Sequence, residues 1–325
     1  MFDRQLSSGT RQLLRCPICR TRLEAQDARL RCANPACAGA FPIVDGIPVL
    51  LNEARSIFAI DDFLQRRDTT ARLERSGPAK LLDGILNQLP TINDSTQSEG
   101  HYLRFREALL RKTAKPRVLV VGGSILGEGM QPLADDPALE CVGTDVTFGA
   151  LTSLICDAHD IPFADGCFDG VIVQAVLEHV MDPCRCVEEI HRVLGDNGLV
   201  YAETPFIQQV HMGRYDFTRY THSGHRRLFR RFEEIDSGPI GGPGTALAWS
   251  YQYFLLSFAS SRPLRGLLRA FAQLTSFPLK YFDRLLIGKP GAVDAASGFF
   301  FLGRKNGTTF SDRELVQYYR GALSS

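Results

Sequence analysis

From Lys115 onward, short runs of apolar residues alternate with longer segments in which apolar residues recur at helical spacing. Strands separated by helices in this way indicate a mostly parallel sheet covered by helices, that is, an α/β fold. We expect strands over residues 117–121, 140–144, 168–173, 198–203, 232–236 and 298–304. The pattern therefore predicts one α/β domain over residues 115–325.

One helix of this domain has clear limits in the sequence. Asp182 suits the N-cap, where its side chain can accept a hydrogen bond from the first turn, and Pro183 suits the first helical position. Asn197 and Gly198 supply the expected stop. The apolar residues of one helix face are Val187, Ile190, Val193 and Leu194. A further helix is expected around residues 225–232.

The stretch between the last two expected strands is far longer than a hairpin needs. It contains the aromatic run ALAWSYQYFLLSFA, then basic helical sequence, and then FPLKYFDRLL. The aromatic run is too short to span a bilayer. Three interpretations stay open: a buried helix, a cap over the substrate, or a helix that contacts a membrane surface. We expect a helical cap insertion at about residues 245–290.

The first 52 residues contain two close cysteine pairs, Cys16-Pro-Ile-Cys19 and Cys32-Ala-Asn-Pro-Ala-Cys37. Two tight turns with this spacing can bring four thiolates together around zinc. We expect residues 1–52 to form a zinc ribbon, in which structural Zn²⁺ replaces the core that so small a unit lacks. Two disulfides, or four unrelated buried cysteines, are the alternatives.

Residues 53–114 are charged and interrupted by Gly77-Pro78 and by TINDSTQSEG. This composition predicts a helical linker with a disordered or mobile middle.

The composition bears on the binding partners and the compartment of the protein. Apolar residues make up 44% of the chain, and 37 basic against 36 acidic residues give a net charge of +1. A net charge so close to zero argues against a nucleic-acid partner. No stretch is apolar enough to span a bilayer, the first residues do not form a secretory signal, and the nine cysteines are expected to be reduced. We therefore expect a cytoplasmic protein.

The first strand of the α/β domain runs directly into GGSILGEG. Glycines after a strand let the backbone approach a ligand closely, although Ser124 stands where a glycine is usual. Asp145 follows Gly122 by about 20 residues and ends the next strand, where a carboxylate can accept both hydroxyls of a ribose. These positions predict a nucleotide-like cofactor.

The segment CDAHDIPFADGCFDGVIVQAVLEHVMDPC resembles class I S-adenosylmethionine-dependent methyltransferases of the type-11 group, with a similarity that covers about residues 115–236. The resemblance implies a Rossmann-like sheet whose last strand is antiparallel. It also implies a glycine loop for the methionine part of S-adenosyl-L-methionine, an acidic residue for the ribose, an Asp-Ala pair for adenine and a residue facing the reacting end. In that order, the matching positions are Gly122, Gly123 and Gly127, Asp145, Asp157 and Ala158, and Gln174.

The chain departs from this family at one place. An acidic residue usually stands on the strand before the loop, and here Val120 and Val121 occupy those positions before a loop that is one residue longer. Two rival hypotheses follow: a nicotinamide-dependent enzyme, against which the DAH and VLEHV segments argue, and a non-catalytic adaptor with a degenerate cofactor site.

The N-terminal unit carries a resemblance of its own. CPICRTRL, CANPAC and FPIVDGIPVLL are similar, over about residues 12–52, to a small zinc-ribbon family related to the activator subunit of tRNA and protein methyltransferases. The resemblance implies that a protein partner can bind through the ribbon, and it carries over no catalytic residue.

Methyl transfer from a sulfonium is an in-line displacement, in which the enzyme aligns donor and acceptor and a base can take the proton of the acceptor. Candidate bases follow the strands whose carboxyl ends meet at the ligand-binding edge of such sheets. We select His211, with His179 and Glu203 as alternatives. His159 and His191 are expected to be structural, and a histidine metal site with loose spacing is a further alternative.

The leading hypothesis is methyl transfer to an oxygen or nitrogen of a small molecule or glycan. The aromatic insertion implies a bulky or partly apolar acceptor, such as a glycan or a lipid-linked glycan. An RNA methyltransferase is the second hypothesis, since some ribosomal-RNA methyltransferases place a zinc ribbon before such a domain. Local positive charge supports it slightly, at Arg226, Arg227, Arg230 and Arg231. The non-catalytic adaptor is the third.

Overall fold

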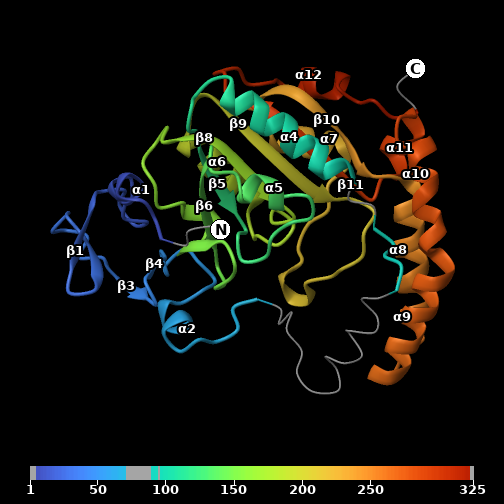
Figure 1. The fold of residues 1–325 in the computed structure, drawn as a ribbon, viewed down its shortest axis with the longest axis horizontal. Coiled ribbons are helices and arrows are strands. Elements are labelled where there is room, and N and C mark those ends of the chain that lie inside the picture. The colour runs from blue at the N-terminus through green and yellow to red at the C-terminus, as the bar shows by residue number, and fades with distance from the viewer. Residues whose placement is uncertain (1–4, 71–88, 94–95, 323–325) are drawn as a thin grey trace.

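The computed structural model describes residues 5–70, 89–93 and 96–322. Its centre is an 11-stranded sheet with the order β1-β2-β3-β4-β7-β6-β5-β8-β9-β11-β10 (Figure 1). The strands from β5 onward are β5 (Arg117–Val121), β6 (Glu140–Asp145), β7 (Thr152–Cys156), β8 (Phe168–Gln174), β9 (Leu194–Pro205), β10 (Glu233–Gly241) and β11 (Gly298–Arg304). β5 to β9 are parallel, and β11 runs antiparallel between β9 and β10. The predicted mostly parallel sheet with an antiparallel last strand is confirmed.

Within the α/β part, one strand of the sheet is missing from the prediction. β7 has the sequence TSLIC, and all five of its residues are buried. Its threonine, serine and cysteine hide the apolar run by which buried strands are recognised. The strand becomes visible only through its parallel pairing with β6.

Helices cover both faces of the sheet. α4 (Thr96–Leu110) packs Phe105 and Leu109 against Val118 on one face. The other helices outside the insertion are α2 (Ile60–Leu64), α5 (Gln131–Ala134), α6 (Pro183–Val193), α7 (His222–Leu228) and α12 (Asp312–Gln317). α6 belongs to the core cluster of the opposite face, through Val187 and other residues. The sheet is therefore shielded on two sides, and the carboxyl ends of its strands stay available for a site.

The expected start of α6 is confirmed and its expected end is wrong. The Asp182 side chain accepts a hydrogen bond from Arg185 N at 3.1 Å, as an N-cap does. The helix ends at Val193, and β9 begins at the next residue. Asn197 does adopt a left-handed conformation, with φ of 59°, but it does so inside β9.

The N-terminal unit is continuous with the central sheet. Its strands are β1 (Leu23–Gln26), β2 (Arg29–Cys32), β3 (Ala40–Val44) and β4 (Ile47–Leu50), and they pair as an antiparallel meander. The short helix α1 (Ser8–Gln12) precedes them. β4 is buried and pairs in parallel with β7, with Val49 opposite Ile155 and Leu50 opposite Cys156. The sequence does not predict that this unit extends the sheet of the α/β part.

Side chains reinforce the same contact. Arg20 donates to the Ile161 carbonyl at 2.8 Å and pairs with Glu189 at 2.8 Å. Arg15 N donates to the Pro162 carbonyl at 2.9 Å. The N-terminal unit is therefore held by backbone and charged contacts as well as by its apolar strand.

The expected linker is only partly a linker. Gly77-Pro78 lies outside the described residues, and so do two residues of TINDSTQSEG. α4 begins within that run, at Thr96, and belongs to the core of the α/β part.

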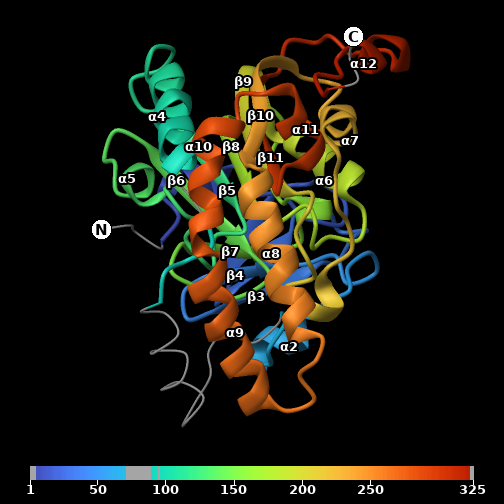
Figure 2. The same ribbon diagram turned by 90° about the vertical axis from the view of Figure 1, so that its right-hand side faces the viewer.

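The segment between β10 and β11 is helical. It comprises α8 (Pro243–Leu256), α9 (Arg262–Ser276), the 3₁₀ turn η3 (Phe277–Phe282), α10 (Asp283–Leu286) and α11 (Pro290–Ala295). α8 and α9 lie side by side as an outer layer at one edge of the molecule (Figures 1 and 2). The buried carboxylate of Asp283 accepts hydrogen bonds from Gly244 N at 2.7 Å and Thr245 N at 3.0 Å, which caps α8. Among the described residues, no helix has the length and apolar character needed to cross a bilayer.

Candidate functional site

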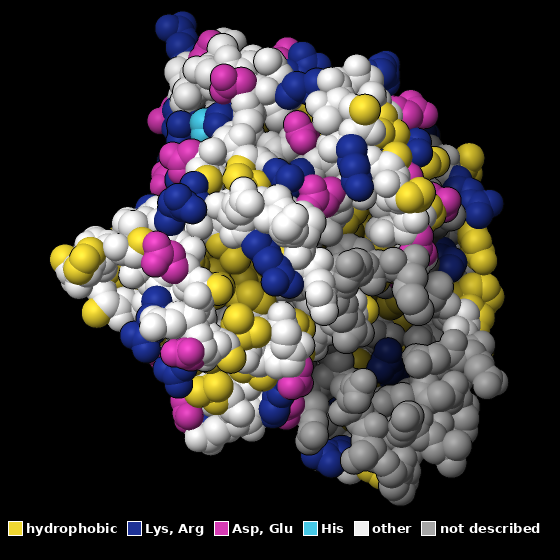
Figure 3. Space-filling view, turned by 60° about the vertical axis from the view of Figure 1, so that its left-hand side comes forward, with side chains coloured by type: hydrophobic (Ala, Val, Ile, Leu, Met, Phe, Trp, Pro, Cys, Tyr) yellow, Lys and Arg dark blue, Asp and Glu magenta, His cyan; other side chains and the backbone are white. Residues whose placement is uncertain are grey.

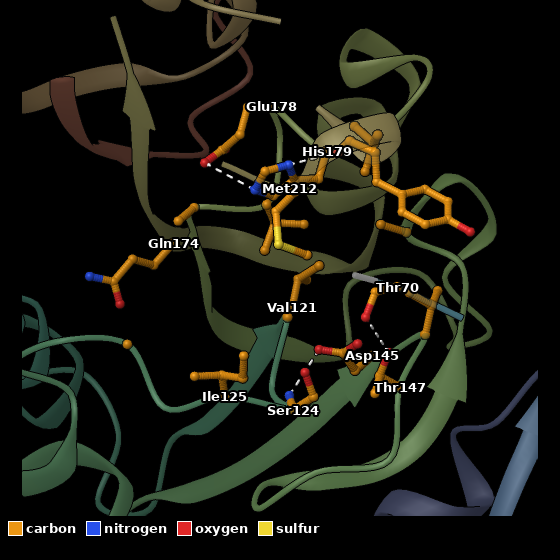
Figure 4. Close-up of a pocket in the computed structure, with 18 of the residues that line it drawn as sticks. Thr70, Val121, Ser124, Ile125, Asp145, Thr147, Gln174, Glu178, His179 and Met212 are labelled. Atoms are coloured by element: carbon orange, nitrogen blue, oxygen red, sulfur yellow. Dashed lines mark hydrogen bonds and ion pairs between the residues drawn. The ribbon is translucent and has the colours of Figure 1, made fainter. Parts of the chain in front are cut away.

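A cavity of about 1330 Å³ lies at the carboxyl ends of β5 to β9. The chain switches from one side of β5 to the other at this edge, which is where doubly wound sheets bind ligands. Figure 4 shows Ser124 and Asp145 along one side of the cavity. Glu178 and His179 lie on the opposite side. We call these sides the Asp145 end and the Glu178 end.

The structure brings most of the predicted site residues together here. The predicted cofactor residues that line the cavity are Gly122, Gly127, Asp145, Asp157, Ala158 and Gln174. The predicted catalytic residues His179, Glu203 and His211 line it as well. Gly123 lies behind the loop instead, where a Cβ atom would come within 3.2 Å of the Gly143 Cα.

Asp145 ends β6 and faces the loop that follows β5. Its carboxylate accepts a hydrogen bond from Ser124 N at 2.8 Å. Burial raises the pKa of Asp145, although the bonds from Ser124 and from the backbone of Val146 oppose that rise. The backbone of the loop therefore holds the Asp145 carboxylate at the cavity wall.

Asp157 follows β7 and is buried. It accepts hydrogen bonds from His159 N at 3.0 Å and from His159 Nδ1 and Ser56 Oγ at 2.5 Å each. Burial would raise the pKa of this carboxyl, but these bonds outweigh it and the pKa is lowered. Because Asp182 N donates to His159 Nε2 at 3.0 Å, the His159 proton sits on Nδ1. His159 is thus a structural residue that holds Asp157 ionised and in place.

The loop after β5 differs from its expected form. Gly122 has φ of 86°, a conformation that favours glycine. The helix that follows the loop is α5, a single turn that begins at Gln131. A long helix does not point its N-terminus at the cavity here, so the loop itself and Asp145 carry the polar contacts of this end.

A hydrogen-bonded chain fixes Gln174 at the end of β8. Tyr102 donates to Gln174 Oε1 at 2.6 Å, and Gln174 Nε2 donates to Glu203 Oε2 at 2.8 Å. Tyr201 donates to the other oxygen of Glu203 at 2.5 Å. Burial raises the pKa of Glu203. Both oxygens of Glu203 accept hydrogen bonds, which fix the Glu203 carboxylate between Gln174 and Tyr201.

The Glu178 end contains two histidines and a buried carboxylate. His179 Nε2 and His211 Nε2 are 3.1 Å apart, and His179 Nε2 is 3.7 Å from Glu178 Oε1. Burial lowers the pKa of both histidines, to about 4 for His179, and raises the pKa of Glu178 to about 8. The base candidate His211 is therefore one member of a three-residue cluster.

The loop that carries His211 is held on two sides. Asp216, clamped by Arg219, accepts a hydrogen bond from His211 N at 2.8 Å. On the other side, α8 donates from Tyr253 to the Val210 carbonyl at 2.9 Å. α8 also contributes two residues to the lining of the cavity, Thr245 and Trp249.

The four ribbon cysteines form a separate cluster. Their sulfur atoms lie within 4.8 Å of one another, with Cys16 and Cys37 at 3.7 Å and Cys19 and Cys32 at 3.4 Å. Thiolates that share a tetrahedral Zn²⁺ at about 2.3 Å are spaced by about 3.8 Å. The donor set and its spacing fit a structural zinc, and none of these four residues lines the cavity.

Two of the clustered arginines make ion pairs within the protein. Arg226 is 2% exposed, pairs with Glu234 at 3.0 Å and donates to the Phe229 carbonyl at 2.9 Å. Arg230 pairs with Asp312 at 2.8 Å. Figure 3 shows basic and acidic side chains interspersed over the face it presents. Arg226 and Arg230 therefore each have an acidic partner within the protein.

Sequence reasoning gave too little weight to two carboxylates. Glu178 is adjacent to the selected His179, but only the structure reveals that it is fully buried and faces both histidines. Glu128 lies in the glycine loop and lines the cavity. The sequence could have pointed to Glu128, because it is the one acidic residue of GGSILGEG.

Comparisons with known proteins match parts of the chain to known families. Residues 121–202 match a family described as a methyltransferase domain, Methyltransf_11. The N-terminal region matches a UPF0434 protein of Bordetella pertussis with 42% identity over 55 residues, which make up 17% of this chain and 89% of the relative. A UPF0434 protein of Bordetella parapertussis matches to the same extent.

Solved structures with a similar fold are more distant. One is phosphoethanolamine N-methyltransferase 2 of Haemonchus contortus with S-adenosyl-L-methionine, at 15% identity and a TM-score of 0.45 over 80% of this chain and 62% of that chain. Another is a chain from the complex of the Haloferax volcanii Trm112 methyltransferase activator with a candidate methyltransferase. Its identity is 18% and its TM-score 0.39, over 65% of this chain and 93% of that chain. Likeness at this level does not extend to a substrate.

Proposed function

Because the chain is an S-adenosylmethionine-dependent methyltransferase whose N-terminal unit belongs to the UPF0434 family, we propose that it methylates an oxygen or nitrogen of a small molecule or glycan. One observation carries this proposal. A single cavity joins a ribose-type carboxylate, Asp145, to a pair of histidines across from it. A donor held at the first end would present its methyl group toward the second.

The Asp145 end is the proposed cofactor site. Asp145 would accept the ribose hydroxyls, and Asp157 with Ala158 would bind adenine. We further propose that Glu128 holds the amino group of the methionine part, in place of the acidic residue that Val120 and Val121 replace. Its position in the cavity wall, beside the loop glycines, supports that role.

The Glu178 end is the proposed acceptor site. His179 and His211 present ring nitrogens to one another at 3.1 Å, next to the Glu178 carboxylate. A hydroxyl or amine placed here would lie beside groups that can accept its proton or stabilise the charge left when the proton leaves. Trp249 and Thr245 of α8 add an apolar and polar wall suited to a ring-bearing acceptor such as a sugar.

An acceptor attached to a lipid is favoured by the outer helical layer. The exposed apolar side chains of this layer are Leu247 and Phe254 on α8, Leu267, Phe271 and Leu274 on α9, and Phe258 between the two helices. α9 also carries Arg262, Arg265 and Arg269. Apolar residues with neighbouring cations are typical of helices that lie on an anionic membrane surface. The layer would bring the cavity to a lipid-linked glycan without a membrane span.

The ribbon has a proposed structural role, as the unit that supplies β4 to the sheet. A protein partner would bind the hairpin of β1 and β2, which extends away from the α/β part of the molecule in Figure 1. Zinc held by thiolates requires reduced cysteines, which favours the cytoplasm as the place of action.

The cofactor assignment is tested by calorimetry of S-adenosyl-L-methionine and S-adenosylhomocysteine binding to the purified protein. Asp145→Ala should weaken binding by about 100-fold, because two hydrogen bonds to a charged group are lost. Asp196→Ala is the matched control, since Asp196 is exposed and does not line the cavity. Absence of binding by folded wild-type protein would refute the proposal and favour the adaptor hypothesis.

RNA methylation is the second candidate, and the structure offers it less support. Arg226 is buried in an ion pair with Glu234, and the more exposed Arg230 pairs with Asp312, so two of the four clustered cations already have acidic partners. An affinity for RNA that fell steeply with salt would reverse this preference.

A further inference from the structure

Three polar side chains at the Glu178 end are close enough to share one ligand. One carboxylate oxygen of Glu178 and one ring nitrogen each of His179 and His211 lie within 4.8 Å of one another. Two imidazoles and a carboxylate form a donor set typical of divalent first-row transition metals. The proposed function leaves open what occupies the space between them.

The hydrogen bonds of the two histidines fix which nitrogens are free. His179 Nδ1 faces the Tyr215 carbonyl at 2.8 Å, and His211 Nδ1 faces the Gln209 carbonyl at 3.3 Å. A carbonyl only accepts, so each Nδ1 carries the proton and each Nε2 presents a lone pair. A ring N–H bonded to a backbone carbonyl is the usual outer contact of a metal-binding histidine.

The two lone pairs point at each other across 3.1 Å. That arrangement is repulsive unless a cation lies between them. Two nitrogens each bound at about 2.1 Å to one metal are about 3 Å apart when they occupy neighbouring octahedral positions. The observed separation matches that geometry without movement of either ring.

Glu178 supplies an independent observation. Its side chain is 1% exposed, and neither carboxylate oxygen has a hydrogen-bond partner. A buried carboxylate without a partner costs several kcal/mol, about 3 or more, so it is retained where something binds it. Figure 4 shows this carboxylate directed at the ring of His179.

We propose that Glu178, His179 and His211 bind one divalent transition-metal ion, of the Zn²⁺, Co²⁺ or Fe²⁺ class. Three protein ligands leave positions open, and these positions face the cavity because His179 and His211 line its wall. The contacts that would hold these ligands in position are already present. Asp216 holds the backbone of His211, and the Glu178 carbonyl accepts from Phe217 N at 2.8 Å.

The role of this ion rests on the proposed function. A hydroxyl of the acceptor bound at an open position becomes more acidic, and its proton passes to water. The oxygen lone pair then forms the bond to the methyl carbon, while the carbon–sulfur bond breaks and its electron pair stays on sulfur. The ion thereby takes the part that His211 would have as a lone base.

The test begins with full-length protein that holds one zinc per chain in its ribbon, as measured by elemental mass spectrometry. Co²⁺ is then added and its visible absorption recorded. We expect one additional Co²⁺ per chain, without the intense charge-transfer band that thiolate ligands give. Co²⁺ does not readily displace ribbon zinc, because zinc binds such sites more tightly.

Variants separate this site from adventitious binding. His211→Ala and Glu178→Gln should each weaken Co²⁺ binding by about 100-fold or more, while Cys184→Ser, at an exposed cysteine outside the cluster, should not. Glu178→Gln is the second variant because it keeps the buried shape if His211→Ala fails to fold. Absence of the additional Co²⁺, or unchanged binding by both variants, would overturn the proposal and leave a shared proton between the histidines.

Cofactor binding is measured on the same samples. Co²⁺ binding without S-adenosyl-L-methionine binding would preserve the metal site and refute the proposed function. Cofactor binding without Co²⁺ binding would do the reverse.

Discussion

The two ends of the cavity differ in how completely their polar groups are satisfied. At the Asp145 end, Asp157 has three hydrogen bonds and Asp145 accepts from the loop backbone. At the Glu178 end, both carboxylate oxygens of Glu178 lack partners and two histidine lone pairs oppose each other. The polar groups of the Asp145 end are satisfied by partners within the protein. Those of the Glu178 end are satisfied only when a ligand is bound.

The difference follows from where the residues come from. Strand ends and short turns of one sheet build the Asp145 end, so main-chain groups lie ready to bond its carboxylates. The Glu178 end is closed by a loop from residues 206–220 and by α8, which lie far apart in sequence from β8. Unpaired buried polar groups cost about 1–3 kcal/mol each, so the second end is where ligand binding should stabilise the protein most.

The largest effect expected from this comparison is on turnover. His211→Ala should lower kcat by about 10²–10⁴-fold, as the loss of a group that acts on the acceptor proton or on its metal does. The affinity for S-adenosyl-L-methionine should change little, because His211 lies across the cavity from Asp145. Steady-state kinetics and calorimetry on one preparation measure both quantities.

Asp145→Ala supplies the opposite pattern and serves as the control. It should weaken cofactor binding while cofactor-saturated turnover falls less. If His211→Ala weakened cofactor binding as much as Asp145→Ala does, the two ends would not be functionally separate.

The same contrast explains what the sequence could predict. Asp145 and the glycines after β5 follow predicted strands, so their position could be inferred from a pattern of apolar runs. Asp157 follows the unpredicted β7 and was assigned only through the resemblance to methyltransferases. Glu178 could not be assigned a role, because its burial depends on Phe217 and its neighbours folding back onto it. The pairing of β4 with β7 was equally invisible, since strand partners across an interface leave no local periodicity.

The fold should also be sensitive to acid, through a buried histidine outside the cavity lining. His225 on α7 is buried, and burial together with the charges of His222 and Arg226 lowers its pKa to about 3. Above about pH 6.5 the residue is neutral in both folded and unfolded chains and contributes no pH dependence. Below that pH only the unfolded chain binds the proton, so stability falls as pH falls.

This residue alone should remove about 2 kcal/mol of stability between pH 7 and pH 5, at about 1.4 kcal/mol per pH unit below its unfolded pKa. Urea unfolding at several pH values measures the slope. His225→Gln should flatten the slope by about one proton, whatever its effect on stability at pH 7. An unchanged slope in the variant would show that His225 is already protonated in the folded protein.

The smallest effect is expected from the loop of the Asp145 end. A Cβ atom on Gly127 would lie 1.6 Å from Gln174 Oε1, so Gly127→Ala must push Gln174 away from Tyr102 and Glu203. We expect cofactor affinity to fall by about tenfold, which corresponds to about 1.4 kcal/mol. Calorimetry measures the loss.

Gly100→Ala is the matched control for that substitution. Gly100 lies in α4 with no atom within 4 Å of an added Cβ, so alanine should leave affinity unchanged and stabilise the helix by about 0.5–1 kcal/mol. Equal cofactor affinity in both variants would mean that Gln174 can move without cost. The Asp145 end would then be less rigid than its hydrogen bonds indicate, and the contrast between the two ends would rest on the Glu178 cluster alone.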